Sequence, residues 1–316
     1  MAYKTKTGIL AVAALCLVAV FMTIKAGGNW DYILPKRGMK VLAIILTGSA
    51  IAYATLVFQT IANNRILTPS IMGLDSLYMM IQTFVIFVFG SKTRPVMDSN
   101  LNFLLCVGLM VLFSAILYKV LFKRDQQNIY YLLLIGIIFG TLFQSLATFW
   151  QVLIDPNEFQ IVQDKMFASF NNINTKLLGI AGVLMVLVFA YFWRFNKYLD
   201  VLSLGREQAI NLGVDYDYVV KRLLIGVAIL ISIATALVGP ITFLGLLVVN
   251  VTYEFMKTYR HSYLIPASML ISVIALVGGQ LVVERVFTFS TTLSVIINFV
   301  GGIYFIYLLL KESKSW

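Results

Sequence analysis

The feature that most constrains this chain is a series of apolar runs separated by short clusters of charged residues. Each run is about 17 to 25 residues long, the length that crosses the hydrocarbon core of a bilayer as an α-helix. Hydrophobic residues make up 60% of the 316 residues and charged residues only 12%, a balance that soluble domains do not show. The sequence therefore predicts an all-α, multi-spanning membrane protein.

The apolar runs predict about ten transmembrane helices within one membrane domain that covers residues 1–316. The runs lie near residues 8–25, 38–62, 71–90, 99–121, 128–153, 176–194, 222–238, 241–258, 263–282 and 289–310. If the N-terminus is cytoplasmic, most of the 24 Lys and Arg residues fall in inner segments. Because basic residues are enriched in inner segments, this distribution predicts that both termini are cytoplasmic.

Three connectors have features beyond a simple link. The first outer connector goes against the charge distribution, because Lys25, Lys36, Arg37 and Lys40 all lie in it or beside it. The outer connector at 155–174 is expected to form a short interfacial helix. The inner connector, about residues 195–221, contains the sequence DVLSLGREQAINLGVDYD, which predicts a short amphipathic helix between two glycines. A solvated loop and a helix that docks on a partner are both open readings of this segment.

The sequence lacks the motifs of ATP hydrolysis and of intramembrane proteolysis. The chain has no G-x-x-x-x-G-K-[ST] loop, so any ATP must be hydrolysed by a partner. His261 is the only histidine, so the chain cannot contain the H-E-x-x-H motif of an intramembrane metalloprotease. We expect the His261 side chain to be solvated at the level of the lipid headgroups. We predict no catalytic site, no metal site and no enzyme activity. Basic residues cluster beside span ends, which also argues against a nucleic-acid partner.

Ionisable groups are nearly absent from the middle of the predicted spans, which argues against an ion-coupled carrier. Asp75 is the exception, and we expect it to snorkel or to cap a helix near the inner interface. Neutral polar residues are more frequent. Four of them share one face of the fifth predicted helix: Thr141, Gln144, Ser145 and Thr148. Such a stripe either joins helices by hydrogen bonds or faces a water-filled pathway, and the sequence leaves both readings open.

Three segments resemble motifs of the iron-chelate and cobalamin uptake permeases. The matching residues are Gln59, Asn64, Pro69 and Gly73 in a turn after the second span, Leu204, Gly205, Glu207, Ala209, Leu212 and Gly213 in the inner connector, and Gly239, Phe243 and Gly245 around the start of the eighth span. The chain departs from the family pattern at Arg65, Ile66 and Leu67, which replace P-L-A, and at Val249 and Asn250, which replace P-H. The resemblance runs through nearly the whole chain in the family's order.

The resemblance implies the permease subunit of a binding-protein-dependent ABC (ATP-binding cassette) importer in the bacterial cytoplasmic membrane, which carries iron–siderophore complexes by alternating access. It implies ATPase subunits, which bind the ATP and Mg, at a coupling loop formed by Leu204, Gly205, Arg206, Glu207, Ala209, Leu212 and Gly213. It implies an extracytoplasmic binding protein at Lys36, Arg37 and Arg285. A second permease subunit, identical or different, completes the pathway, and this chain itself holds no cofactor.

Two kinds of alternative remain. A secondary carrier or a membrane scaffold would use no nucleotide, and the docking-like inner connector argues against the scaffold. A haem or cobalamin importer permease would share the same architecture. The sequence does not name the chelate, because selectivity in such importers is expected to lie mostly in the receptor.

Overall fold

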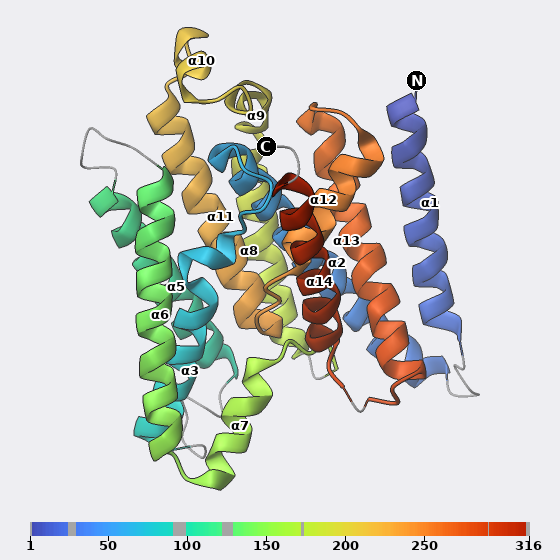
Figure 1. The fold of residues 1–316 in the computed structure, drawn as a ribbon. Helices are drawn as coiled ribbons and strands as arrows, with labels where there is room; N and C mark the ends of the chain where they lie inside the picture. Colours follow the sequence, from blue (N-terminus) through green and yellow to red (C-terminus); the bar gives the residue numbers. More distant parts are fainter. Residues whose placement is uncertain are drawn as a thin grey trace.

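The computed structural model describes residues 2–24, 30–90, 99–121, 129–171, 174–289 and 291–313. Within these ranges the regular secondary structure is helical (Figure 1). The long helices are α1 (Ala2–Thr23), α2 (Trp30–Ala62), α5 (Ser99–Leu121), α6 (Ile129–Leu153), α8 (Thr175–Trp193), α11 (Tyr216–Val238), α13 (His261–Arg285) and α14 (Leu293–Ser313). The shorter elements are η1 (Pro69–Met72), α3 (Leu74–Phe89), α7 (Pro156–Met166), α9 (Asn196–Leu202), α10 (Arg206–Asn211) and α12 (Leu244–Met256). The all-α prediction is confirmed for this part of the chain.

In the described ranges, the eight long helices have the length and apolar composition needed to cross a membrane. Helices α3 and α12 are also apolar but have only 16 and 13 residues. Their rise of about 24 Å and about 20 Å is less than the roughly 30 Å of a hydrocarbon core. The predicted runs 71–90 and 241–258 are longer than these helices because apolar residues also occupy the turns that precede them. The number of spans therefore stays a prediction.

Helices α3 and α12 both begin in the interior of the protein. Gly73, with a φ of 78°, ends η1 immediately before α3, and Gly239, with a φ of 97°, ends α11 shortly before α12. Glycine adopts this left-handed region without steric strain, and Pro240 cannot continue a helix. The first residues of the two helices, Leu74 and Leu244, are 1% and 0% exposed. The helical structure is thus interrupted twice inside the bundle: at Gly73, which we name the first helix break, and at residues 239–243, which we name the second helix break.

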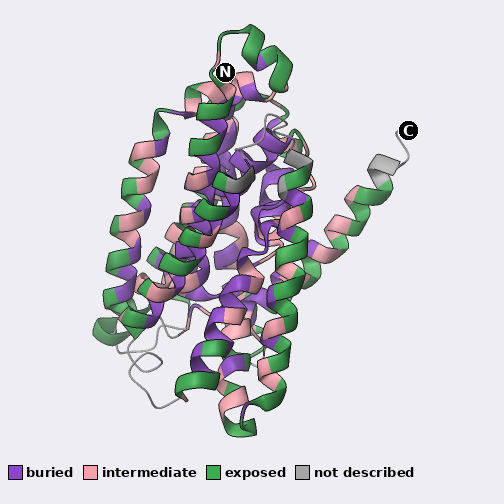
Figure 2. Ribbon diagram, turned by 90° about the vertical axis from the view of Figure 1, so that its left-hand side faces the viewer, coloured by how far each residue is buried: buried purple, intermediate pink, exposed green. Residues whose placement is uncertain are grey.

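Helix α2 is the central element of the core. It packs against α1, α8, α9, α11, α12 and α13, and from Ala50 to Ala62 every residue is buried. Helices α1, α6 and α14 lie at the periphery and keep most of their apolar side chains exposed (Figure 2). Exposed apolar side chains along helices of this length are expected of surfaces that contact lipid or another membrane subunit.

The two ends of the bundle carry different short helices. The start of α1 lies at the same end as α9 and α10, which we name the α10 end (Figure 1). Helix α7 lies at the opposite end, which we name the α7 end. The prediction of a short helix within 155–174 is confirmed by α7, whose first turn is capped because the Asp155 carboxylate accepts a hydrogen bond from the backbone N–H of Asn157.

Candidate functional site

The α10 end carries a structured segment formed by α9 and α10. The predicted amphipathic helix is confirmed as α10, which starts after Gly205 and ends before Gly213, and these glycines have φ angles of 96° and 81°. Ala209 is fully buried and holds α10 against the rest of the protein. Arg206 and Glu207 are exposed, as are the apolar side chains of Leu204, Ile210 and Leu212. An ordered helix with an exposed apolar surface suits a protein partner better than a solvated loop does.

The expected solvated position of His261 is wrong. The His261 side chain is 2% exposed and lies between two polar groups from other helices. Its Nδ1 atom lies 2.7 Å from Oδ1 of Asp200 on α9, and its Nε2 atom lies 2.8 Å from the hydroxyl oxygen of Thr60 on α2. Packing of α9 over the start of α13 removes the imidazole from solvent. Local sequence patterns could not predict this contact, because Asp200 and Thr60 are 61 and 201 residues away from His261.

The turn between α2 and α3 is held by the first residues of the predicted family motif. The Gln59 side-chain amide donates to the carbonyl oxygen of Arg65 over 2.7 Å, and Asn64 Oδ1 accepts from the backbone N–H of Ile66 over 2.9 Å. Pro69 then opens η1, where its missing N–H is not needed. The turn is thus formed although Arg65 and Ile66 depart from the family pattern.

Glycines allow η1 and α6 to pack with their backbones in contact. A Cβ atom added at Gly136 would lie 2.8 Å from Cα of Met72, and one added at Gly73 would lie 2.8 Å from Cα of Gly140. Any larger side chain would therefore push the break away from α6. The Gly136 and Gly140 pair is a close-contact motif of the small-xxx-small kind.

The polar stripe of α6 lies on the surface of the chain. Thr141, Gln144, Ser145 and Thr148 are all exposed. The three hydroxyl groups donate to backbone carbonyls one turn earlier in the same helix rather than to another helix of the described chain. Thr141, Gln144 and Ser145 line an open groove that also includes Ser70 and Ser76 beside the first helix break. Of the two readings, this position favours a stripe that faces a pathway over one that joins helices of the described chain by hydrogen bonds.

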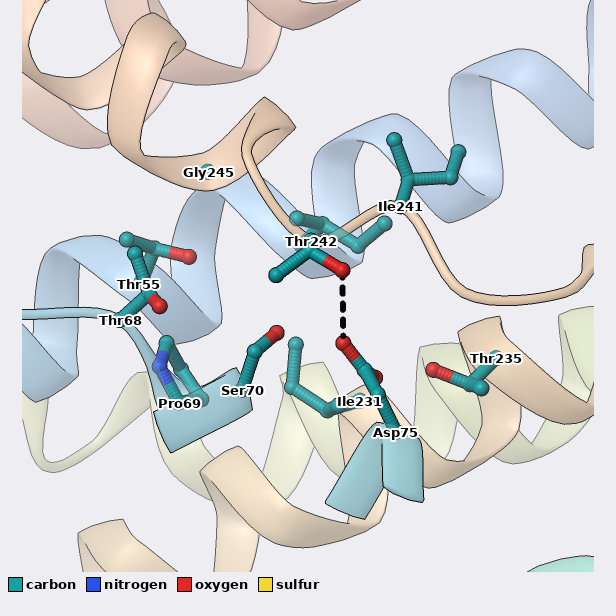
Figure 3. Close-up of a pocket in the computed structure, with 11 residues that line it drawn as sticks. Thr55, Thr68, Pro69, Ser70, Asp75, Ile231, Thr235, Ile241, Thr242 and Gly245 are labelled. Carbon is teal, nitrogen blue, oxygen red and sulfur yellow. Dashed lines mark hydrogen bonds between the residues drawn. The ribbon is translucent and has the colours of Figure 1, made fainter. Parts of the chain in front are cut away.

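Asp75, which is expected to snorkel or to cap a helix near the inner interface, lies beside the helix break that precedes α3. It is half-buried in the first turn of α3, and its Oδ2 atom accepts a hydrogen bond from the Thr242 hydroxyl over 3.2 Å (Figure 3). Asp75 follows the first helix break, and Thr242 lies in the second helix break. Thr55, Ser70 and Thr235 line the same small cavity, which has room for about one water molecule. A helix start and hydroxyl donors both favour a carboxylate at this position.

The remaining motif residues serve packing around the second break. A Cβ at Gly245 would collide with the Thr55 side chain, so α12 and α2 cross closely at this glycine. Gly239 lies against the backbone of Ala168. The backbone N–H of Phe243 donates to Asn298 Oδ1 over 3.4 Å, which joins the break to α14. These residues shape the break, and Gly245 also lines the small cavity beside Asp75.

At the α7 end, two of the basic residues near the start of α2 are used within the chain. The Arg37 guanidinium donates to the carbonyl oxygens of Phe21, Met22 and Ile24 over 2.9 to 3.0 Å. These carbonyls end α1, where helix geometry leaves them unpaired and a cation is favoured. Lys40 forms an ion pair of 2.8 Å with Glu284 on α13.

The other basic residues at this end differ in their exposure. Lys36 is exposed and its Nζ atom lies 5.8 Å from the ring centre of Tyr32. Arg285 is partly buried and donates to the carbonyl oxygen of Ile24 over 3.1 Å. Lys25 lies outside the described residues. Part of the positive charge at this end therefore has a structural explanation, and Lys36 remains the most accessible of the three residues expected to meet a receptor.

The chain is similar to known permease proteins along its whole length. Petrobactin import system permease protein YclO of Bacillus subtilis (strain 168) is 65% identical over 316 residues, which is all of both chains. Petrobactin import system permease protein FatC of Bacillus anthracis is 36% identical over 280 residues, which cover 89% of this chain and 79% of that relative. Identity of this extent shows common ancestry across the full membrane domain.

A solved structure has the same fold. It is a metal-chelate type ABC transporter in an inward-facing conformation, which superimposes with a TM-score of 0.82 at 21% identity over 98% of this chain and 99% of that one. The model of the FecCD transport family matches residues 6–311. The chain therefore belongs to the FecCD transport family.

Proposed function

We propose that this chain is the permease subunit of a binding-protein-dependent ABC importer that carries iron–petrobactin across the bacterial cytoplasmic membrane. The observation that carries the proposal is the 65% identity, over the full length of both chains, to a petrobactin import permease. Membership of the FecCD transport family favours an importer over a secondary carrier or a scaffold. The identity to petrobactin permeases favours a siderophore over haem or cobalamin as the cargo.

The positions of the short helices support an orientation with both termini in the cytoplasm. We place the α10 end in the cytoplasm, where α10 meets the ATPase subunits, so that the chain starts and finishes on the cytoplasmic side. The exposed Leu204, Ile210 and Leu212 supply an apolar contact surface, and Glu207 adds a charge beside it. ATP and Mg bind to the partner subunits, and this chain binds no cofactor.

The membrane domain in this proposal has ten spans. Helices α3 and α12 complete the count although they are short, because the chain reaches each of them through a segment without α-helical structure that neighbouring helices partly cover. Residues 63–73 precede α3 on the side of the α10 end, and residues 239–243 precede α12 on the side of the α7 end. Backbone of this kind is tolerated at membrane depth where protein surrounds it. The partly buried contact between Asp75 and Thr242, one residue from each break, supports this placement.

The pathway lies between this chain and a second permease subunit, identical or different. The exposed face of α6 that carries Thr141, Gln144, Ser145 and Thr148 supports this placement. These neutral side chains can form hydrogen bonds with a large polar chelate without binding it tightly. Alternation between inward-open and outward-open states then depends on how ATP binding biases two arrangements of the subunits.

The receptor binds at the α7 end in this proposal. Lys36 is exposed, and Arg285 is partly accessible beside the end of α1. Positive side chains at this end would attract acidic residues of a substrate-binding protein and raise the rate of encounter. Arg37 contributes mainly by holding the end of α1 in place, since its guanidinium already has three carbonyl partners.

Uptake in a deletion strain tests the substrate. Cells that lack this gene should lose import of radioactive iron supplied as iron–petrobactin and should regain it with the wild-type gene. Import of iron supplied with a hydroxamate siderophore should be the same in all strains, which controls for general loss of iron uptake. Equal petrobactin-dependent uptake with and without the gene would refute the proposal.

A further inference from the structure

Helices α2 and α13 are joined near both ends by side-chain contacts. At the α10 end, the hydroxyl oxygen of Thr60 on α2 lies 2.8 Å from Nε2 of His261, the first residue of α13. At the α7 end, Nζ of Lys40 on α2 lies 2.8 Å from Oε1 of Glu284 on α13. Lys40 and Thr60 are separated by about 30 Å of helix, so the two contacts lie a membrane thickness apart.

Both contacts are shielded from solvent. The side chains of Lys40 and Glu284 are 12% and 8% exposed, and Thr60 and His261 are 5% and 2% exposed. If the helices slid past one another, each contact would leave a buried polar or charged group without its partner, which is strongly unfavourable. The pair therefore resists relative motion at either end.

Helix α9 is fixed to both members of this pair. Oδ1 of Asp200 accepts the Nδ1–H of His261 over 2.7 Å and the backbone N–H of His261 over 2.8 Å. The second bond satisfies an N–H group that the start of α13 would otherwise leave unpaired, and the helix dipole favours a carboxylate there. On α2, the Tyr53 hydroxyl donates to Oδ1 of Asn196 over 2.7 Å.

Helix α10 has the opposite character. Among the residues of α10 only Ala209 is buried, whereas Leu199 and Leu202 of α9 are 0% and 2% exposed. The segment thus has an anchored half that contacts the core and an exposed half that is available to a partner. A force applied to α10 can reach the bundle through α9 and through the start of α11, the two elements that α10 contacts, and of these α9 is the one bound by side chains to both α2 and α13.

We propose that α2 and α13 move as one rigid unit that carries a displacement of α10, through α9, to the α7 end of the protein. In this assignment Asp200, His261 and Thr60 are positioning residues, and the ion pair of Lys40 with Glu284 keeps the far ends together. The inference rests on the proposed function, in which a partner ATPase displaces α10. It names the two helices that receive the displacement.

The test compares two carboxylates of the same region that are similarly exposed. The Asp200 side chain is 44% exposed and contacts α13, whereas the Asp217 side chain is 50% exposed and lies 3.9 Å from Arg206. We expect Asp200→Ala to lower the amount of iron–petrobactin imported per ATP by about fivefold or more in the reconstituted complex. Thr60→Val, which keeps the side-chain volume, should act in the same direction, and Asp217→Ala should change the ratio less than about twofold.

A second measurement follows position rather than transport. Nitroxide labels on Gln208→Cys in α10 and Val282→Cys in α13, with Cys16 and Cys106 replaced by serine, report the distance between the two helices in the purified complex. The distribution should broaden with Asp200→Ala and stay narrow with Asp217→Ala. This readout needs no transport, so it separates failure of this inference from failure of the proposed function. An unchanged distribution, or an unchanged import ratio with Asp200→Ala, would overturn the inference.

The rigid unit also predicts a dependence between distant sites. Asp200→Ala and Glu284→Gln lie at opposite ends of the pair, and changes so far apart usually have independent effects. If the pair moves as one body, the combined variant should lose no more coupling than the more severe single variant. Losses that multiply would show that the two ends act separately, and would contradict the proposal.

Discussion

The side-chain amide of Asn250 on α12 donates a hydrogen bond to the carbonyl oxygen of Arg65 over 2.9 Å. Gln59 donates to the same oxygen, and the Arg65 guanidinium carbon lies 4.4 Å from the ring centre of Tyr253. Arg65 and Asn250 are both positions where the chain departs from the pattern of its family. Both residues thus join the turn after α2 to α12, Asn250 through the backbone carbonyl of Arg65 and the Arg65 side chain through Tyr253.

Loss of this contact should lower stability. Asn250→Ala removes one of the two donors to the Arg65 carbonyl, so we expect the free energy of unfolding to fall by about 1 kcal/mol. The midpoint of thermal unfolding in detergent measures the effect. Asn211→Ala, at an exposed position of α10, is the matched control and should leave the midpoint unchanged. Equal midpoints for the two variants would show that the Asn250 contact contributes nothing.

The close approach of η1 to α6 makes a second prediction. Gly136→Ala places a Cβ atom 2.8 Å from the Met72 backbone, and relief of that overlap should destabilise the protein by about 1 to 3 kcal/mol. Gly108→Ala on α5 is the control, because nothing lies within 4 Å of the added atom. Folded yield after detergent extraction distinguishes them. A wild-type yield for Gly136→Ala would mean that the break can shift freely.

The basic residues at the α7 end should separate into two roles. Lys36→Glu reverses an exposed charge, so the rate of receptor association should fall several-fold at low ionic strength and less at high ionic strength. Arg37→Ala removes three hydrogen bonds to the end of α1 and should mainly reduce stability. Surface plasmon resonance with the purified receptor and thermal unfolding measure the two effects.

This separation has a clear contrary outcome. If Arg37→Ala weakens receptor binding as much as Lys36→Glu does while its unfolding midpoint stays at the wild-type value, Arg37 is a receptor contact and its bonds to α1 are dispensable. If Lys36→Glu leaves the association rate unchanged at low salt, the receptor does not bind beside Tyr32.

The exposed stripe of α6 yields a prediction about transport. Gln144→Trp should slow uptake while stability changes by less than about 0.5 kcal/mol, because the side chain is exposed in this subunit. Ile138→Trp, at another exposed position of the same helix, should leave uptake unchanged. If both variants slow uptake equally, the effect belongs to added bulk on α6 and the stripe does not face the pathway.

Local sequence patterns predicted the elements whose structure depends on neighbours in the chain. The glycines at 205 and 213 bound α10 because a positive φ angle is a local requirement, and α7 begins where Asp155 and Pro156 form a capped start. The family turn likewise forms from Gln59 and Asn64, which bond to backbone groups only a few residues away.

Contacts between distant segments could not be predicted in this way. The burial of His261 depends on α9, which local patterns around His261 do not reveal. The hydrogen bond of Asp75 likewise depends on Thr242, which is 167 residues away. The charge of Arg37 and its place in an outer connector indicate a receptor contact. Only the position of the end of α1 shows that its guanidinium has three carbonyl partners within the chain. Apolar runs also overstate helix length at α3, because η1 contains the apolar residues Ile71 and Met72.

The most direct test of the account is the source of energy for transport in proteoliposomes that contain this chain, a second permease, the ATPase subunits and the receptor. We predict that iron–petrobactin accumulates only with ATP. Glu207→Arg on the exposed side of α10 should abolish accumulation while ATP hydrolysis continues. Accumulation driven by a sodium or proton gradient without ATP, or wild-type accumulation by Glu207→Arg, would contradict an importer that is driven through α10.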